Sequence, residues 1–89
     1  AIDEVIRKHM KDVRACWVDA RTRAPDGGTI TVKFTIGADG AVTDARIKAT
    51  TIPDARFQAC VVEEFRTFQF PAPEGGGVVI VSYPFVFSP

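Results

Sequence analysis

Cys16 and Cys60 are the only cysteines of this 89-residue sequence, and their positions suggest what chemistry they can have. Each falls on the apolar stripe of a segment with helical spacing, and the two segments are expected to pack side by side. In an oxidising compartment the two thiols would form a disulfide, whereas in the cytosol they would be two buried thiols. The residues alone leave both states open.

The remaining reactive side chains do not form a recognisable catalytic or metal-binding pattern. His9 is the only histidine and is expected on a helix surface, and two cysteines with one histidine lack the spacing of a known metal site. Asp39 and Asp44 are better explained by a turn and a β-bulge than by paired acid–base work. The glycines at 75–77 lack the lysine and P-loop pattern of a phosphate site. The sequence therefore predicts no enzyme, no cofactor and no metal.

Composition and charge narrow the class of protein further. The hydrophobic content of 46% is typical of a globular chain, and 11 basic residues balance 11 acidic ones. An RNA-binding sheet would need exposed aromatic residues among basic ones, and Phe34 could lie on such a face, but the neutral net charge argues against it. No apolar run is long enough to span a bilayer. We expect residues 1–89 to form a single domain of a longer protein whose targeting segments lie upstream.

The elements that position the cysteines begin with an N-terminal helix. It is predicted by apolar residues that recur at intervals of three and four, namely Ile2, Val5, Ile6, Met10, Val13, Cys16, Trp17 and Ala20. The segment 25–28, Pro-Asp-Gly-Gly, ends this helix and leads into the next element.

A β-hairpin follows at residues 28–50. Ile30, Val32, Phe34 and Ile36 alternate with polar residues, which predicts a strand with one buried face, and residues 37–40 (Gly-Ala-Asp-Gly) supply the turn. We expect Phe34 to pack under Trp17 and Phe57 in the core.

The return strand of the hairpin has an irregular phase. Val42 lies at an even position, whereas Ala45, Ile47 and Ala49 lie at odd positions and would share the other face. A β-bulge near Thr43 and Asp44 would restore the phase. The alternative is that Val42 belongs to the turn.

A second helix is predicted from about Asp54 to Arg66, with Asp54 or Thr51 as its N-cap and Pro53 in its first turn. The last element is a strand from Val78 to Phe87. Pro84 lacks the amide that a central strand needs, so this strand is expected at the edge of the sheet.

The order helix, strand, strand, helix, strand predicts an α+β fold. A crossover helix makes the third strand parallel to the second and antiparallel to the first, which gives a three-stranded sheet of order 2-1-3. Both helices would cover one face of this sheet, and residues 30–36 would form its central strand.

These segments resemble the C-terminal domains of TonB proteins. The hairpin at 28–36 and 39–45 looks like that family's hairpin, and the residues at 68–73 (Phe-Gln-Phe-Pro-Ala-Pro) resemble its aromatic-x-Phe-Pro junction before the last strand. More specifically, the sequence resembles the AgmX/PglI C-terminal variant of this domain. The similar segments are Cys16-Trp17, Cys60, Phe70-Pro71-x-Pro73 and Tyr83-Pro84-Phe85. That variant occurs in myxobacterial and related envelope proteins, including gliding-motility components.

The resemblance implies a periplasmic domain that is tethered to the inner membrane by an upstream helix and contacts outer-membrane or other envelope partners. An oxidising periplasm also favours the disulfide over free thiols. The long first helix and the two cysteines depart from typical TonB domains, so a TonB-type partner and energy source do not follow from the resemblance.

Two classes of function follow. The first is a protein–protein interaction module that binds an extended peptide by strand addition to its last strand. The second is a structural spacer or oligomerisation unit, for example a homodimer. The residues predicted for the partner-binding edge are Val78, Val79, Ile80, Val81, Ser82, Tyr83 and Phe85.

Overall fold

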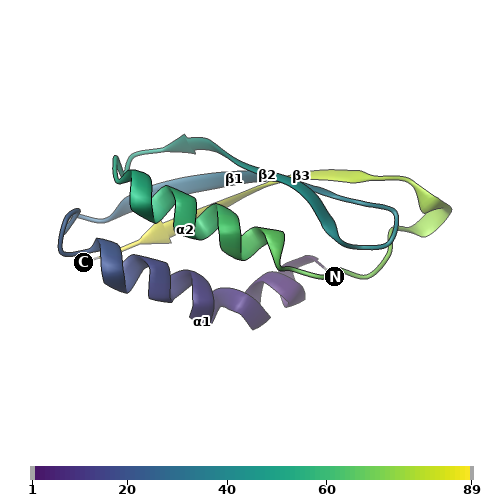
Figure 1. Cartoon of the computed structure of the whole chain (residues 1–89), viewed down its shortest axis with the longest axis horizontal. Helices are drawn as coiled ribbons and strands as arrows, with labels where there is room; N and C mark the ends of the chain where they lie inside the picture. Colours follow the sequence, from purple (N-terminus) through teal and green to yellow (C-terminus); the bar gives the residue numbers. More distant parts are fainter. Residues whose placement is uncertain (1, 89) are drawn as a thin grey trace.

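Two helices cover one face of a three-stranded antiparallel sheet (Figure 1). The computed structural model describes residues 2–88. Its elements, in chain order, are α1 (Ile2–Ala20), β1 (Gly28–Ile36), β2 (Val42–Thr50), α2 (Ala55–Arg66), a 3-10 turn (Glu74–Gly76) and β3 (Val79–Phe87). The strand order is β2-β1-β3. The α+β class, the element order and the sheet order are as predicted, whereas β3 begins one residue later because Val78 lies outside the ladder.

The start of α2 depends on one side chain. The Oδ1 atom of Asp54 accepts hydrogen bonds from the amides of Arg56 (3.0 Å) and Phe57 (3.3 Å). Asp54 is therefore the N-cap, which confirms one of the two predicted alternatives. Pro53 precedes the cap and does not lie in the first turn, where it had been expected. The hydroxyl of Thr51, the other candidate, accepts a hydrogen bond from the amide of Thr29 (2.9 Å).

The turn between β1 and β2 has the predicted chemistry. Asp39 Oδ1 accepts a hydrogen bond from the amide of Ala41 (3.1 Å), and Gly40 has a φ of 89°. A Cβ atom at Gly40 would also collide with the carbonyl of Phe70. Glycine is required here both for the left-handed backbone and for the close approach of the segment at Phe70.

Strand β2 contains the predicted bulge. Ile36 pairs with Val42 and Thr35 with Asp44, so Thr43 is the additional residue. Val42 therefore belongs to the strand and not to the turn.

A second bulge in β2 was not predicted. Val32 pairs with Ile47 and Thr31 with Ala49, which leaves Lys48 as another additional residue. This bulge changes the phase of the alternation again, so Ala49 is exposed. The expectation that Ala49 shares the core face with Ala45 and Ile47 was wrong, because the extra residue Lys48 lies between Ile47 and Ala49.

The core between the helices and the sheet contains a connected set of aromatic rings among aliphatic side chains. Near the C-terminal end of α1, Trp17 and Phe57 pack around Phe87, with ring centroids 5.6 and 5.4 Å from it. Phe34 is fully buried, as predicted, but packs against Phe65 (5.0 Å) and Phe70 (5.5 Å). The predicted contact of Phe34 with Trp17 and Phe57 was wrong. Trp17 and Phe57 surround Phe87, which pairs with Gly28 at the start of β1, whereas Phe34 lies near the end of that strand.

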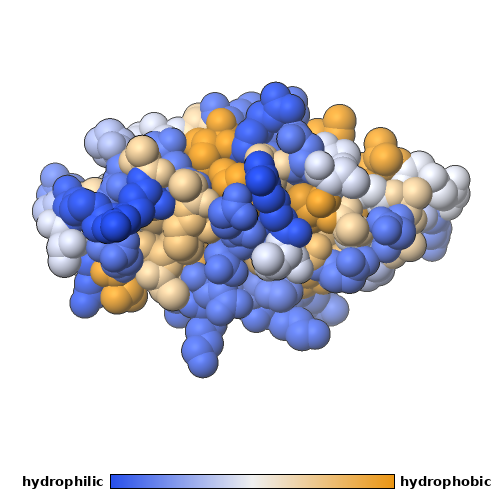
Figure 2. All heavy atoms as spheres, viewed as in Figure 1, coloured by the Kyte–Doolittle hydropathy of each residue, from blue (hydrophilic) through white to orange (hydrophobic). Residues whose placement is uncertain are grey.

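The opposite face of the sheet is not covered by a helix. Thr35 of β1 lies opposite Ile80 of β3, and Thr29 lies opposite Val86. Ile80 is 63% exposed and Val86 is 73% exposed. In the space-filling view the α1 layer is largely blue, and most of the orange apolar surface lies at the level of α2 and the sheet (Figure 2).

Within residues 2–88, we find no helix with the length and apolar character needed to cross a bilayer.

Candidate functional site: the outer edge of β3

The outer edge of β3 is the main candidate site. The strand pairs with β1 on one side, and no other segment of residues 2–88 pairs with its second side. Its position at the border of the sheet agrees with the expectation drawn from Pro84. The backbone groups on this second side are therefore available to an added strand.

The hydrogen bonds of β1 show which residues of β3 point outward. The carbonyl of Thr29 accepts from the amide of Thr51 (3.0 Å), and the amide of Gly37 donates to the carbonyl of Ala41 (2.8 Å). Odd-numbered residues of β1 therefore direct their backbone groups toward β2, and even-numbered ones toward β3, because these directions alternate along an antiparallel strand.

The one-to-one register then assigns each position of β3. Even-numbered residues of β1 lie opposite odd-numbered residues of β3, for example Phe34 opposite Val81. Odd-numbered residues of β3 thus form the ladder with β1, and even-numbered residues direct their amides and carbonyls outward. The outward amides of the strand belong to Ile80, Ser82 and Val86.

Pro84 fits this alternation. It lies opposite Thr31, whose backbone groups point to β2, so the missing amide of Pro84 removes no hydrogen bond between β1 and β3. It removes an outward donor instead. The segment at Ile80 and Ser82 is consequently the part of the edge where consecutive outward positions can both donate and accept.

The two edges of the sheet differ in whether they are protected against pairing with another strand. The β2 edge carries two bulges and three exposed charged residues, Asp44, Arg46 and Lys48. Bulges and charges of this kind prevent pairing with another strand. Strand β3 has neither, since its register with β1 is continuous and the sequence from 78 to 87 contains no charged residue.

The side of β3 that faces the helices is only partly covered. The exposed fraction falls from 36% at Val79 to 5% at Phe85. Between them lies Tyr83, which is half-buried; burial raises the pKa of its hydroxyl, and the nearby carboxylate of Asp3 raises it further. An added strand would meet apolar side chains of β3 at its first residues and a closed core at its last ones.

Sequence reasoning missed a small apolar pocket beside the first residues of β3. The pocket has a volume of about 160 Å³ and is lined by Ile2, Ile36, Phe70, Pro71, Pro73 and Val79. Its walls come from α1, β1, β3 and the segment that precedes β3. No local pattern could have revealed it, because only the tertiary fold brings these segments together.

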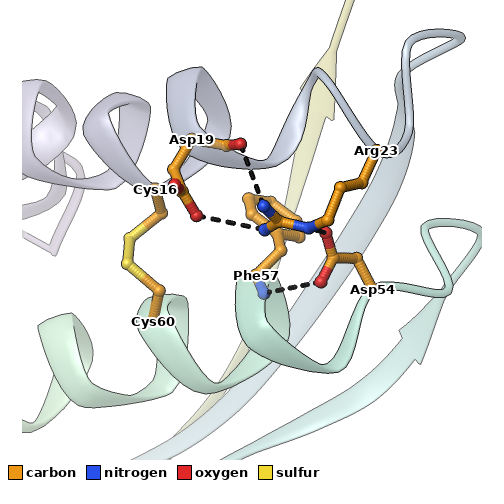
Figure 3. Close-up of a disulfide and its surroundings, with 6 residues drawn as sticks. All are labelled: Cys16, Asp19, Arg23, Asp54, Phe57 and Cys60. Carbon is orange, nitrogen blue, oxygen red and sulfur yellow. Dashed lines mark hydrogen bonds and ion pairs between the residues drawn. A yellow bond between two sulfur atoms is a disulfide. The ribbon is translucent and has the colours of Figure 1, made fainter.

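The predicted disulfide between Cys16 and Cys60 is present, with an S–S distance of 2.05 Å (Figure 3). It joins the C-terminal half of α1 to the middle of α2, so the two helices that cover the sheet are covalently connected. Its loop spans a sequence separation of 44 residues.

A cluster of charged side chains near the disulfide was also missed by the sequence reasoning (Figure 3). Arg23 donates from Nε to Asp54 Oδ2 (2.7 Å) and from Nη2 to Asp19 Oδ2 (3.0 Å). The hydrogen bond from Arg23 lowers the pKa of Asp54, and the amides of Phe57 and Arg56 act in the same direction, while desolvation opposes them. The guanidinium thus connects the end of α1 to the N-cap of α2.

Asp54→Asn is expected to flatten the acid side of the stability profile. Because the folded-state pKa of Asp54 is lowered, its carboxylate stabilises the fold above the ordinary carboxyl pKa, and this contribution is lost as pH falls through the lowered value. Asparagine retains the cap but not the charge. The Tm of the variant, measured from pH 7 to 2, should fall less than that of the wild type. Glu74→Gln, in the loop before β3, is the control and should follow the wild-type profile; an Asp54→Asn profile parallel to wild type would contradict the account.

The other candidate residues have structural roles. His9 was predicted on the helix surface; it is only partly exposed, because its ring stacks on Phe68 with centroids 4.4 Å apart. Asp44 forms an ion pair with Arg46 (2.9 Å). A side chain at any of the glycines 75–77 would meet no other atom within 4 Å, so these glycines line no site. Among residues 2–88, no three His, Cys, Asp or Glu side chains lie close enough together to hold a metal ion.

The comparisons with known proteins identify the fold. No protein-family model matches the sequence. No curated protein matches it either. Among solved structures, the chain is similar to the TonB C-terminal domain of Pseudomonas aeruginosa, with 24% identity and a TM-score of 0.55 over 74% of this chain and 70% of that one.

Two solution structures of the Helicobacter pylori TonB C-terminal domain are also similar. A shorter fragment has 24% identity and a TM-score of 0.58, covering 94% of this chain and 92% of its own. A longer fragment has 21% identity and a TM-score of 0.59, covering 91% and 80%. With two helices on one face of a sheet of order 2-1-3, the chain has the fold of TonB C-terminal domains.

Proposed function

We propose that this chain is a protein–protein interaction module that binds an extended segment of a partner by strand addition to β3. The observation that carries the proposal is the contrast between the two sheet edges. The β3 edge is regular, uncharged and supplied with outward backbone groups at Ile80 and Ser82, whereas the β2 edge is bulged and charged. Proteins normally protect a long apolar edge, so an unprotected one indicates a use for it.

The proposed contact is smaller than the set of residues predicted from the sequence. Val79, Val81 and Tyr83 direct backbone groups to β1 and would contribute through their partly exposed side chains. Val78 precedes the ladder but remains exposed beside it. Phe85 is buried against Phe65, with ring centroids 5.7 Å apart, and we leave it out of the contact.

We further propose that residues 1–89 act as one periplasmic domain of an inner-membrane-anchored envelope protein, with a non-enzymatic role. The TonB-like fold and the disulfide support this location, since disulfides persist in oxidising compartments. The AgmX/PglI-like features of the sequence support a gliding-motility or related envelope protein. The partner would then be a periplasmic segment of an outer-membrane or other envelope protein.

A structural spacer or oligomerisation role is the alternative. The same free edge of β3 could pair with β3 of a second copy and form a homodimer without any peptide ligand. Self-association that depends on protein concentration and protects the outward amides of β3 would support this alternative over a peptide partner.

Ser82→Pro is expected to weaken peptide binding without unfolding the domain. The substitution removes an outward amide and leaves the ladder with β1 intact, because β3 pairs with β1 through its odd-numbered residues. Affinity for a heptapeptide selected from a random display library should fall about tenfold, as expected for one or two lost hydrogen bonds. Isothermal titration calorimetry measures the affinity, and circular dichroism confirms the fold.

Val86→Pro is the matched control for this variant. It also removes an outward amide, but it lies beyond Pro84, where the pairing is expected to end. Its affinity for the same peptide should equal that of the wild type. Equal binding by Ser82→Pro and the wild type, with both folded, would refute strand addition at this edge.

A further inference from the structure

We propose that the pocket beside the first residues of β3 is a specificity site that takes one apolar side chain of the added strand. This inference rests on the proposed strand addition and names the chemistry of the partner: an extended peptide with a branched aliphatic or aromatic residue at one inward position. The pocket is lined by Ile2, Ile36, Phe70, Pro71, Pro73 and Val79.

The register of strand addition directs a peptide side chain toward this pocket. In a sheet, residues directly opposite each other on adjacent strands point to the same face. Val79 lies opposite Ile36 on the helix-covered face, and both residues line the pocket. A peptide residue opposite Val79 on the outer edge therefore points to this same face, at the rim of the pocket.

The incomplete burial of β3 leaves this rim open. Val79 is partly exposed, and Val81 and Tyr83 are half-buried, whereas Phe85 and Phe87 are closed off by the core. Along the strand, the accessible inner face thus coincides with the residues before Pro84, where the outward amides of Ile80 and Ser82 lie. Val79 belongs both to this part of β3 and to the lining of the pocket, so it joins the backbone edge to the pocket.

The size and chemistry of the pocket fit a single side chain. Its volume of about 160 Å³ is close to that of an apolar cavity that binds benzene, roughly 150 Å³. It is well below the roughly 300–1,000 Å³ of sites for drug-sized molecules. None of its lining residues carries a charge, so a charged peptide residue would lose its hydration there without a partner.

A set of synthetic heptapeptides tests the inference directly. The peptides alternate threonine and serine and carry one central residue, which is alanine, leucine, phenylalanine or aspartate. Burial of an apolar side chain predicts that the leucine and phenylalanine peptides bind roughly ten- to a hundredfold more tightly than the alanine peptide. The aspartate peptide should bind no better than the alanine peptide. NMR titration gives both the affinities and the amide shifts at Ile80 and Ser82.

Ile2→Trp fills the pocket from the first turn of α1, and Val18→Trp on the exposed face of the same helix is the matched control. Ile2→Trp should abolish the preference for leucine and phenylalanine while the peptides still shift the amides of Ile80 and Ser82. Val18→Trp should retain the wild-type preference. A preference that persists in folded Ile2→Trp, or is missing from the wild type, overturns the pocket but not strand addition.

Benzene alone tests the pocket independently of any strand. It should shift the methyl resonances of Ile2 and Val79 in the wild type and not in Ile2→Trp; unchanged resonances in the wild type overturn the inference. If no peptide shifts the amides of Ile80 and Ser82, the proposed function fails, and the peptide-side-chain role fails with it. Concentration-dependent shifts of these residues without any peptide would assign the surface to a second copy and overturn the inference as well.

Discussion

Replacing Cys16 and Cys60 by alanine is expected to lower the free energy of unfolding by about 4 kcal/mol. This figure follows from the entropy that the crosslink removes from the unfolded chain for a loop of this length, a sequence separation of 44. A domain of this size has a total stability of roughly 4–13 kcal/mol. The loss is therefore a large part of this total, and urea denaturation monitored by circular dichroism measures it.

Reduced wild-type protein is the control for this variant. Alanine avoids burying a hydroxyl at Cys16, which is only 2% exposed, so reduction and substitution should give similar midpoints. Mass spectrometry of the oxidised protein under denaturing, non-reducing conditions should show the loss of two hydrogens and no reactive thiol. Two titratable thiols in protein exported to the periplasm would contradict the structure.

Phe34→Ala is expected to cost about 3–5 kcal/mol, the range for removal of a fully buried aromatic side chain. Phe34 is 0% exposed and lies between Phe65 and Phe70, so the cavity would open at the junction of β1, α2 and the segment before β3. Phe70 also lines the apolar pocket, so the cavity would open beside it. Chemical denaturation of the purified variant gives the loss.

Lys33→Ala is the matched substitution on the other face of β1. Lys33 is exposed and lies opposite Ser82 and Arg46, so its removal should change stability by less than about 0.5 kcal/mol. A loss below about 1 kcal/mol for Phe34→Ala, or equal losses for the two variants, would mean that the helices do not cover the face assigned to them.

The fold was predictable because its signals are local and repeated. The alternation at residues 30–36 determines a strand with one buried face, and the helical spacing around Cys16 and Cys60 determines two amphipathic helices. Pro84 gave the position of the last strand, since a missing amide is tolerated only where no ladder bond is lost. Placing both helices on the same face brought the two cysteines together, but the choice of a disulfide over free thiols needed the resemblance to a periplasmic domain.

The errors concern features that depend on tertiary contacts. The bulge at Lys48 leaves no clear signal in composition, and it turns the side chain of Ala49 away from the core, so Ala49 is exposed. The partners of Phe34 depend on where along the strand each helix crosses. The contact of Arg23 with Asp54 joins residues 31 positions apart, and the apolar pocket joins four separate segments.

Hydrogen exchange at the amides of Ile80 and Ser82 tests the central claim most directly. Both amides point away from β1, so in the free domain they should exchange rapidly, whereas the amides of Val81 and Tyr83 in the ladder should be protected. Addition of a saturating partner peptide should protect Ile80 and Ser82 selectively. Unchanged exchange at these two amides in a complex of proven stoichiometry, with new protection elsewhere, would contradict strand addition at β3.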